Sequence, residues 1–512
     1  MEEDGNNNII QLNKDYSDIE KNIESPKRPK KLLWLIIIFA IIVVAIIVII
    51  ILISNKGDKE ESNEVNNYIN VIKAKYYTNI SNPIKLINYD KLNIKLFIDG
   101  KEINFINSTQ FTDLEEHLIE FKFNKELTNL SSLFSGCEML IEINFSSITK
   151  SNIKAMNNLF EDCGSLKKVN FGNLNTSNVE TMAYMFQSCS NIKEIDLKNF
   201  DTSKVTSMEK MFEDCKSLIS VDLEKFNTKN VITMESMFAR CYNLLSININ
   251  NFDLTNTLKT TGMFFLCQSL TKINLKNENK EDSLSIDMNS MFEKCYSLKE
   301  INLENFERKK VNKIQYMFIN CYNLSSIDMT KFDTTEATNF YSLFDGCSSL
   351  KSLDLSQINT EQVTTMNSLF RNCISLESLD LSEWKTSNVT SMTALFYNCS
   401  SLKEVKLDNF NTSKVDYMQF MFENCASLEA IDLSMFDIRN VRDIRSVFQN
   451  CISLIKLDLS NFNGTNISPF SCSNVFETNG PNATIIYNPT ILGENLINQI
   501  PKGWNQTIIT EI

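Results

Sequence analysis

The chain has 512 residues, 43% of them hydrophobic, and a formal net charge of −13. This acidic balance disfavours DNA and RNA as partners, because phosphate binding needs a basic surface. The only histidine, His117, lies in the first quarter of the chain, so the commonest general base and metal ligand is missing from the rest.

The chain opens with a polar segment, residues 1–31, that predicts a disordered cytosolic tail. Residues 32–53 carry no charge and would form a helix about 33 Å long, enough to span a membrane. Four of the five residues at 27–31 are Lys or Arg, which places the tail in the cytosol. We expect a single-pass membrane protein whose C-terminal part is extracellular or lumenal. A cleaved signal peptide is the alternative, disfavoured by the length of the apolar segment and the lack of a small-residue cleavage pattern.

A charged stalk is expected over residues 54–75, followed by an N-terminal cap over 76–130. Within the cap, two apolar-rich runs surround Asp99-Gly100, a turn dipeptide typical of a β-hairpin. Residues 117–123 are typical of a further strand.

Thirteen cysteines then follow at a fixed interval. The interval is 26 residues, with one step of 28 between Cys267 and Cys295. Such spacing indicates stacked modules that each present the same face to the next. The pattern predicts a solenoid over residues 131–472 and a C-terminal cap over 473–512.

Each module combines two hydrophobic periods. Val205, Met208, Met211, Phe212 and Cys215 form one stripe of a helix, and the preceding Asn/Asp-Thr/Ser pairs are typical of a turn and a helix N-cap. The residues after the cysteine alternate as in a short strand. The predicted fold is therefore an α/β repeat with one strand and one helix per module. Helices need about 8–10 Å each and strands about 4.8 Å, so we expect a curved solenoid with its strands on the concave side.

A phenylalanine lies three residues before every one of the thirteen cysteines, and Leu or Ile three residues after it. These columns predict a continuous apolar spine along the stack. Its members include Phe186, Phe212, Phe238, Phe318, Phe344, Phe370, Cys189, Cys215, Cys321 and Cys347.

The unit M-x-x-M-F-x-x-C-x-S-L-x-x-I-D-L-S-x-F resembles the BspA-type leucine-rich repeat of bacterial and protist surface proteins. The resemblance covers residues 118 to about 470. It implies a curved leucine-rich-repeat solenoid on a cell surface, with a role in adhesion and protein binding and no catalytic activity. The apolar segment at 32–53 departs from the cleaved signal and C-terminal wall attachment of many bacterial relatives.

The cysteines allow several interpretations. An extracellular chain with fourteen cysteines is compatible with disulfides. Helices packed about 8–10 Å apart would hold neighbouring cysteines beyond the reach of about 7 Å that a bridge requires. The chain has no C-x-x-C pair, which disfavours a metal site. We favour a small apolar filler, with bridges, metal binding and catalysis as alternatives, and Cys472, which lies off the interval, as the exception.

The strand position seven residues after each cysteine is mostly Asp or Asn. As a functional hypothesis this column is an acidic face that contacts a partner, with calcium as one option; the alternative is a solvated, hydrogen-bonded ladder. The candidate binding residues are Asp196, Asp222, Asp328, Asp354, Asp380, Asp432 and Asp458.

Departures from the repeat are further candidate sites. They are the insertion within 276–287, Trp384 in place of Phe, and Lys406 in the acidic column. Sequons predict surface glycosylation if the host modifies them: Asn79, Asn107, Asn175, Asn388, Asn411, Asn463, Asn466 and Asn482.

The sequence favours a membrane-anchored surface protein that binds a protein or glycan on another cell or matrix. A structural coat component without a specific ligand is the alternative, and a carboxylate-based surface hydrolase is the least favoured. No cofactor and no catalytic residue are expected.

Overall fold

The computed structural model describes residues 68–78, 82–88, 94–249, 251–275, 284–303 and 309–510. The predicted tail (1–31), the predicted membrane span (32–53) and most of the predicted stalk (54–75) lie outside these ranges. Among the described residues, no helix is long and apolar enough to cross a membrane. The predicted single-pass topology and membrane localisation therefore have no support in the structure.

A mostly antiparallel sheet starts the described part of the chain. Its strands are β1 Asn70–Tyr77, β3 Ile94–Ile98, β4 Lys101–Ile103, β6 Glu116–Phe123, β7 Leu140–Ile148 and β8 Lys168–Asn170, and a separate pair is formed by β2 Ile84–Lys85 and β5 Ser108–Thr109. The order across the sheet is β4-β3-β6-β1-β7-β8. The predicted hairpin is present, since β3 and β4 pair antiparallel around Asp99-Gly100. Because β7 pairs antiparallel with β1 and parallel with β8, the end sheet passes at β7 into the parallel stack.

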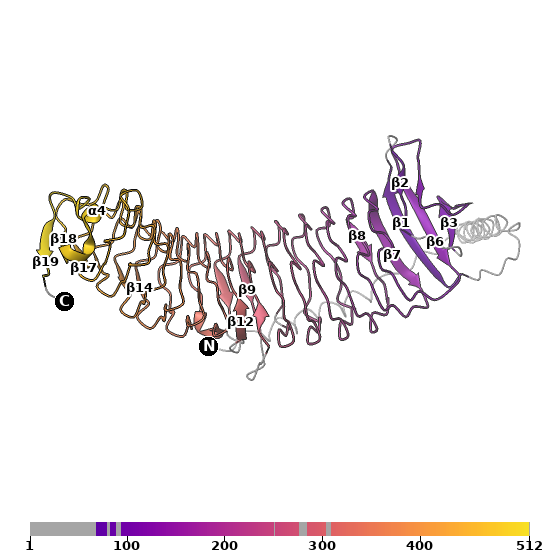
Figure 1. Cartoon of the computed structure of the whole chain (residues 1–512). Helices are drawn as coiled ribbons and strands as arrows, with labels where there is room; N and C mark the ends of the chain where they lie inside the picture. The colour runs from indigo at the N-terminus through magenta and orange to yellow at the C-terminus, as the bar shows by residue number, and fades with distance from the viewer. Residues whose placement is uncertain are drawn as a thin grey trace, which may run out of the picture. The chain divides into compact units, whose positions relative to one another are not determined.

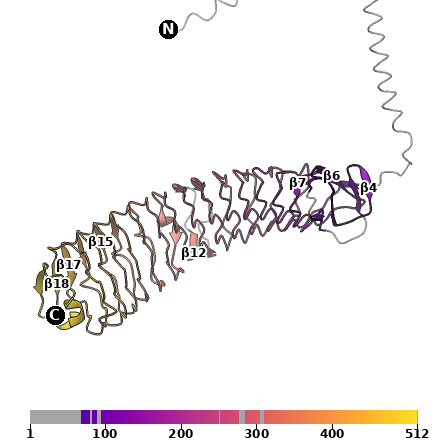
Figure 2. The ribbon, with the colours of Figure 1, turned by 90° about the horizontal axis from the view of Figure 1, so that it is seen from above.

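From here the chain winds into coils that follow one another in single file (Figures 1 and 2). Matching residues of neighbouring coils are 26 residues apart, as in the pairing of Ala430 with Lys456, or 28 apart where the sequence slips, as in that of Lys272 with Glu300. The short parallel strands that the sequence predicted for every module are present in some of these coils. They are β9 Lys272–Asn274, β11 Glu300–Asn302, β14 Ser378–Asp380, β15 Glu404–Lys406, β16 Ala430–Asp432 and β17 Lys456–Leu459.

A second set of short elements lies around the 28-residue step. They are β10 Ile286–Asp287, β12 Lys309–Lys313, the 3-10 turn η1 Met329–Lys331 and β13 Phe332–Asp333. β10, β12 and β13 form their own parallel sheet. Isolated bridges such as Thr181 with Ser207 and Thr365 with Ser391 lie in other coils, so many coils have a second edge at which neighbouring backbones pair.

The predicted helix of each module is wrong. In the described residues the segment before each cysteine consists of consecutive turns, with left-handed residues five and one positions before the cysteine, such as Asn158 and Asp162 with φ of 57°. The fold is a β-solenoid, so the predicted module of one strand and one helix is wrong. The expected curvature was derived from the width of helices, and this reason does not apply to modules that consist of turns.

Hydrogen bonding explains why turns replace the helix. The N–H groups of Met156, Asn158, Phe160 and Asp162 donate to carbonyls of the next coil, at 2.9–3.1 Å. The N–H groups of Leu159 and Glu161 donate to carbonyls three residues back in the same coil. A helix would use every N–H internally and leave no ladder between coils. The left-handed residues cost about 1–2 kcal/mol each, and the ladder of backbone hydrogen bonds between coils offsets this cost.

The spacing of the coils also excludes helices. Fourteen phenylalanine rings form one continuous buried column from Phe134 to Phe476, with neighbouring ring centroids 5.3–6.0 Å apart. Helices pack about 8–10 Å apart and cannot fit at this spacing. The column is covered by Phe121 at one end and Trp504 at the other.

The C-terminal end contains one coil more than the cysteine interval indicates. Phe476 lies 28 residues after Phe448 and continues the column, and Asn479 takes the cysteine position, where its side chain accepts the N–H of Cys451 at 2.8 Å. The solenoid thus extends into the segment 473–512 that was predicted to be only a cap. Beyond this coil come β18 Thr484–Tyr487, the one-turn helices α3 Pro489–Leu492 and α4 Glu494–Ile497, and the edge strand β19 Asn505–Ile508.

Candidate functional site

The candidate binding face is formed by the column of Asp and Asn side chains seven residues after the repeat cysteines, where the strand ends in those coils that have one. One side-chain oxygen of each of nine such residues accepts the N–H of the residue two positions on, at 2.8–3.2 Å. This contact is an Asx-turn, which turns the chain out of the strand. It is made by Asn144, Asn170, Asp196, Asp222, Asp328, Asp354, Asp380, Asp432 and Asp458. The column therefore has a structural role in every coil where this bond is present.

The carboxylates of the column remain on the surface. Asp458 is half-buried, and the other six candidate aspartates are exposed. The backbone N–H of Ser356 lowers the pKa of Asp354, and the hydrogen bond from Lys198 lowers that of Asp196. Hydrogen bonds from Ser382 and Lys406 lower the pKa of Asp380 to about 2. These carboxylates are therefore ionised at neutral pH, each with one oxygen fixed by its turn.

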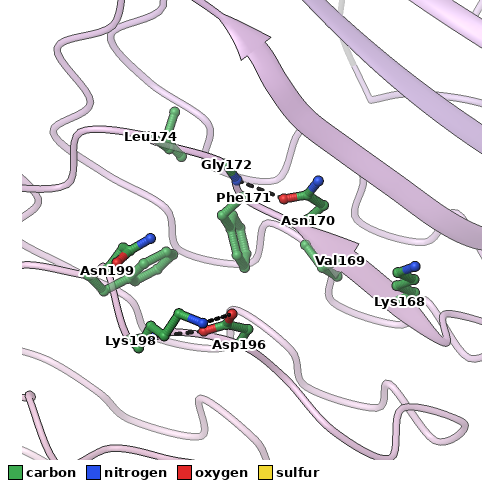
Figure 3. Close-up of a pocket in the computed structure, with 10 residues that line it drawn as sticks. Lys168, Val169, Asn170, Phe171, Gly172, Leu174, Asp196, Lys198 and Asn199 are labelled. Carbon is green, nitrogen blue, oxygen red and sulfur yellow. Dashed lines mark hydrogen bonds and ion pairs between the residues drawn. The ribbon is translucent and has the colours of Figure 1, made fainter. Parts of the chain in front are cut away.

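A groove of about 370 Å³ crosses the strand face near its N-terminal end (Figure 3). The Asp196–Lys198 ion pair, at 2.9 Å, lies on one side and the turn from Asn170 to Gly172 on the other. Gly172 has a φ of 58°, and a Cβ there would lie 2.6 Å from Cα of Ser146 in the preceding coil. Only glycine allows the two coils to approach this closely.

A second groove, of about 340 Å³, lies on the same face between residues 404 and 458. Its walls carry Glu404, Asp408, Asp432 and Lys456, and its floor carries apolar side chains such as Val405 and Ile431. Lys406, which interrupts the acidic column, also lines it and pairs with Asp380 at 2.9 Å. The strand face thus offers shallow grooves with fixed charges of both signs.

The predicted spine residues are all buried. Phe186, Phe212, Phe238, Phe318, Phe344 and Phe370 stack in the column described above, and Cys189, Cys215, Cys321 and Cys347 lie beside it with no exposed surface. All fourteen cysteines fall within the described residues, and each is a free thiol. Desolvation raises the pKa of these thiols, to about 12 for Cys137 and Cys451. A buried thiol of this kind is neither a nucleophile nor a ready metal ligand.

The cysteines have a hydrogen-bonding role that the sequence did not indicate. Twelve of them donate their S–H to the carbonyl oxygen of the column phenylalanine in the preceding coil, at 3.0–3.3 Å. Coils 5.3–6.0 Å apart are close enough for disulfides, so the spacing argument against bridges was incorrect. Each of these twelve thiols instead points toward a carbonyl oxygen.

A buried threonine ladder was also missed. The hydroxyl of Thr360 donates to the carbonyl of Lys385 at 3.0 Å and accepts its N–H at 2.8 Å, and six other threonines make the same double contact one coil on. They are Thr176, Thr202, Thr228, Thr334, Thr386 and Thr412. The signal was the Asn/Asp-Thr/Ser pair, interpreted as a helix N-cap. It is an Asx-turn followed by a contact between coils.

The remaining candidates have structural partners. Trp384 is 2% exposed and packs against Phe370 of the column. Of the sequon asparagines, Asn175, Asn411 and Asn463 form Asx-turns, and Asn388 bonds to Glu361 and Lys414. Asn79 and most of the insertion at 276–287 lie outside the described residues.

Within the described ranges, no group of three His, Cys, Asp or Glu side chains is placed to hold a metal ion. A small polar cluster surrounds His117, whose ring nitrogens lie 2.6 Å from Asp99 and 2.8 Å from Asp113. Its ring stacks on Phe111, with centroids 4.2 Å apart. This cluster lies in the N-terminal sheet region and ties the β3–β4 turn to β6.

Two of the solved structures similar to part of this chain are complexes of longer chains. One is described as the structure of the Toll–Spätzle complex of Drosophila: the identity is 18%, the TM-score 0.22, and the match covers 60% of this chain and 38% of the other. The other is described as the crystal structure of a TLR13–ssRNA13 complex: the identity is 19%, the TM-score 0.22, and the match covers 66% of this chain and 48% of the other. The matched part of this chain thus spans less than half the length of either. At these scores, neither likeness supports a functional argument.

No curated protein matches the chain. A family match covers the solenoid in four segments, residues 128–245, 190–285, 286–404 and 374–483. Together they span more than half of the chain and the whole set of coils that carry the cysteine interval. The chain therefore belongs to the family described as Mycoplasma protein of unknown function, DUF285.

Proposed function

We propose that this repeat protein binds a protein or glycan ligand through the strand face of its solenoid. The observation that carries the proposal is the placement of Asp328, Asp354 and Asp380 at the same position in three neighbouring coils. One oxygen of each accepts the N–H two residues on, at 3.0–3.1 Å, so the orientation of all three carboxylates is fixed.

The second oxygens distinguish these three residues. Both hydrogen bonds to Asp328 reach the same oxygen, whereas the second oxygen of Asp380 accepts from Lys406 at 2.9 Å. Carboxylates that are held rigid suit the ammonium and guanidinium groups of a basic protein segment, or the hydroxyls of a glycan. Because their orientation is fixed before binding, little conformational entropy is lost on association.

A binding role also fits the placement of the thiols and the imidazole, which do not lie on this face in the described part of the chain. The cysteines are buried with raised pKa values, and His117 is held between two carboxylates outside the solenoid. The favoured activity is therefore recognition along an extended surface, with adhesion as its larger-scale consequence.

The test replaces Asp328, Asp354 and Asp380 together by Asn. Asn occupies the same column at Asn144 and Asn170 and caps the same turn, so the fold is retained while three charges are lost. Binding is measured against immobilised matrix proteins and glycans. We expect binding to fall at least tenfold, equivalent to about 1.4 kcal/mol.

The matched control replaces Asp201, Asp253 and Asp333 by Asn. These residues form Asx-turns in a second column and remove the same charge when substituted. Equal loss of binding in both triple variants would show that the effect comes from net charge and not from the position of the aspartates. No binding by the unaltered protein to any of these ligands would favour a coat component without a specific ligand.

A further inference from the structure

The last coils of the solenoid carry an unusual cluster of arginines. The chain contains seven arginines, and three of them, Arg439, Arg442 and Arg445, lie within seven residues. In the other coils the equivalent turn, before each left-handed segment, is mostly Ser, Thr, Asn or Lys. Arginine presents a planar fork of donors that matches a carboxylate, so its concentration here favours recognition of carboxylates over general solubility.

Each of these arginines is oriented by a neighbouring carboxylate that lies deeper. Asp437 accepts Nη2 of Arg439 at 2.6 Å, and Asp443 accepts Nη2 of Arg445 at 2.6 Å. Arg442 lies 3.4 Å from Asp416. The side chain of Arg439 is 66% exposed against 29% for Asp437, and that of Arg442 is 70% exposed against 37% for Asp416. The outermost layer of this surface is therefore cationic, although the protein as a whole is acidic.

A groove of about 590 Å³ lies between these coils. Arg439 and Arg442 line it together with Lys414, Ser468 and Ser471, and Asp416, the partner of Arg442, is the carboxylate in its lining. The Nη1 atoms of Arg439 and Arg445 have no hydrogen-bond partner among the described residues. The pairing with Asp437 and Asp443 uses the Nε–Nη2 edge of each guanidinium, which holds the group in place and leaves its other edge open to a ligand.

Phe470 adds an apolar contact beside this groove. It is 75% exposed, more than any other large hydrophobic side chain among the described residues, and its ring lies 5.2 Å from the guanidinium of Arg445. The turn that displays it is rigid: Pro469 restricts the backbone, and the hydroxyl of Ser468 accepts the N–H of Ser471 at 3.2 Å. Phe470 lies in the second 28-residue step of the repeat, where the regular pattern is broken.

We propose that this surface, formed by Lys414, Arg439, Arg442, Arg445 and Phe470, is a docking site for an acidic peptide segment of a partner protein. The arginines contact Asp or Glu side chains, and Phe470 contacts one apolar side chain of the same segment. Arginine and aromatic residues dominate the energetics of such interfaces, and arginine clusters recognise acidic motifs. This site lies on the turns of the last coils and is separate from the strand face, so it goes beyond the function proposed above.

The exposed ring favours a peptide over a sulfated glycan. A sulfated glycan would satisfy the arginines, but it has no apolar side chain to cover Phe470. The two classes of ligand therefore predict different effects of substituting Phe470.

The experiment measures binding of fluorescent peptides to the full chain at physiological ionic strength. The probes are short peptides rich in Asp and Glu with one Leu or Phe, matched peptides with Lys in place of the acidic residues, and heparin as the sulfated glycan. The variants are Arg442→Gln, Arg442→Lys and Phe470→Ser. The matched control is Lys403→Gln, which also removes one exposed charge from a surface ion pair, with Glu377 at 3.9 Å, away from the groove.

We expect the acidic peptides to bind and the Lys peptides not to bind. Arg442→Gln and Phe470→Ser should each weaken binding about tenfold or more, Arg442→Lys should weaken it less than Arg442→Gln, and Lys403→Gln should change it less than about twofold. The proposal is overturned if acidic peptides bind no better than Lys peptides, or if Lys403→Gln is as harmful as Arg442→Gln. It is also overturned if heparin alone binds and Phe470→Ser has no effect. None of these outcomes bears on the aspartates of the strand face, which the Asn variants test separately.

Discussion

The thiol of Cys321 donates a hydrogen bond of 3.1 Å to the carbonyl oxygen of Phe292 in the preceding coil. The same carbonyl accepts the N–H of Cys295 at 3.1 Å, so it joins a turn within one coil to a thiol of the next. Repeated at twelve cysteines, this contact gives the 26-residue interval a physical cause. Each position needs a small side chain that is apolar enough to be buried and still able to donate a hydrogen bond.

We predict that the thiols make the protein sensitive to alkaline pH. Burial raises the pKa of Cys321 and its equivalents above that of a free cysteine, about 8.5, so the folded state keeps protons that the unfolded chain releases. Ionisation of these thiols does not change the stability below about pH 8.5. Above that pH, the free energy of unfolding falls as the pH rises. Urea unfolding measured across this pH range checks the prediction.

A thiol reagent gives an independent check. The native protein should react with dithionitrobenzoate very slowly, and the denatured chain should react at all fourteen cysteines. Fast labelling of several thiols in the native state at neutral pH would contradict the arrangement described here.

The phenylalanine column should have a large effect on stability. Phe318 contacts the rings of Phe292 and Phe344, at centroid distances of 5.9 and 5.6 Å, and has no exposed surface. Phe318→Ala should destabilise the solenoid by about 3–5 kcal/mol, and Phe318→Leu, which leaves a smaller cavity, by clearly less. Thermal unfolding of both variants measures the difference. Equal midpoints for Phe318→Ala and the unaltered protein would refute a cooperative column.

The threonine ladder allows a closer test of hydrogen bonding. Thr360→Val keeps the shape of the side chain but leaves the buried N–H and C=O of Lys385 without their partner, which should cost about 1–3 kcal/mol. Thr360→Ser keeps the hydroxyl and should cost less. Chemical denaturation distinguishes the two variants, and a Val variant at least as stable as the Ser variant would show that packing, not hydrogen bonding, fixes this position.

The sequence predicted the solenoid, its repeat length, its strands and its buried columns, because these follow from the 26-residue period and the alternation of apolar residues. It did not predict the turns, because Met208, Met211, Phe212 and Cys215 are buried at the same spacing in consecutive turns as on a helix. The distinguishing signal is the residue before each cysteine. Asn320, Asn372, Asn398, Asn424 and Asn450 occupy that position in left-handed conformation, which Asn tolerates better than most residues.

The candidate site was predictable only in part. The sequence showed the Asp column, since its period is that of the repeat. It could not show that one oxygen of each carboxylate already caps a turn, because that depends on where the strand ends. The cluster around Arg442 and Phe470 was not predicted, because it combines Lys414 and Phe470 from different coils.

The contacts of His117 predict a pH-dependent N-terminal sheet. Both ring nitrogens lie within hydrogen-bond distance of a carboxylate, and both can donate when the ring is an imidazolium. Partial burial by itself would lower the pKa of His117, but the hydrogen bonds and charges of Asp99 and Asp113 outweigh this effect and raise it. Glu115 and Glu116 precede His117 in the chain, and Lys75 of β1 pairs with Glu116 at 3.2 Å. Tyr76 lies opposite His117 on β1.

The sign of the pH effect follows from these shifts. The contribution of His117 to stability is fully present below about pH 6.5 and is lost as the pH rises through the raised pKa of the folded state. The lowered pKa values of Asp99 and Asp113 act at the other end, so their contribution is lost below about pH 4. Hydrogen exchange at the amide of Leu118, which donates to Asp99 at 2.9 Å, should therefore be slowest relative to its intrinsic rate between these limits. Asp99→Asn should lower the pKa of His117 in an NMR titration, and an unchanged pKa would mean that Asp99 does not hold the imidazolium.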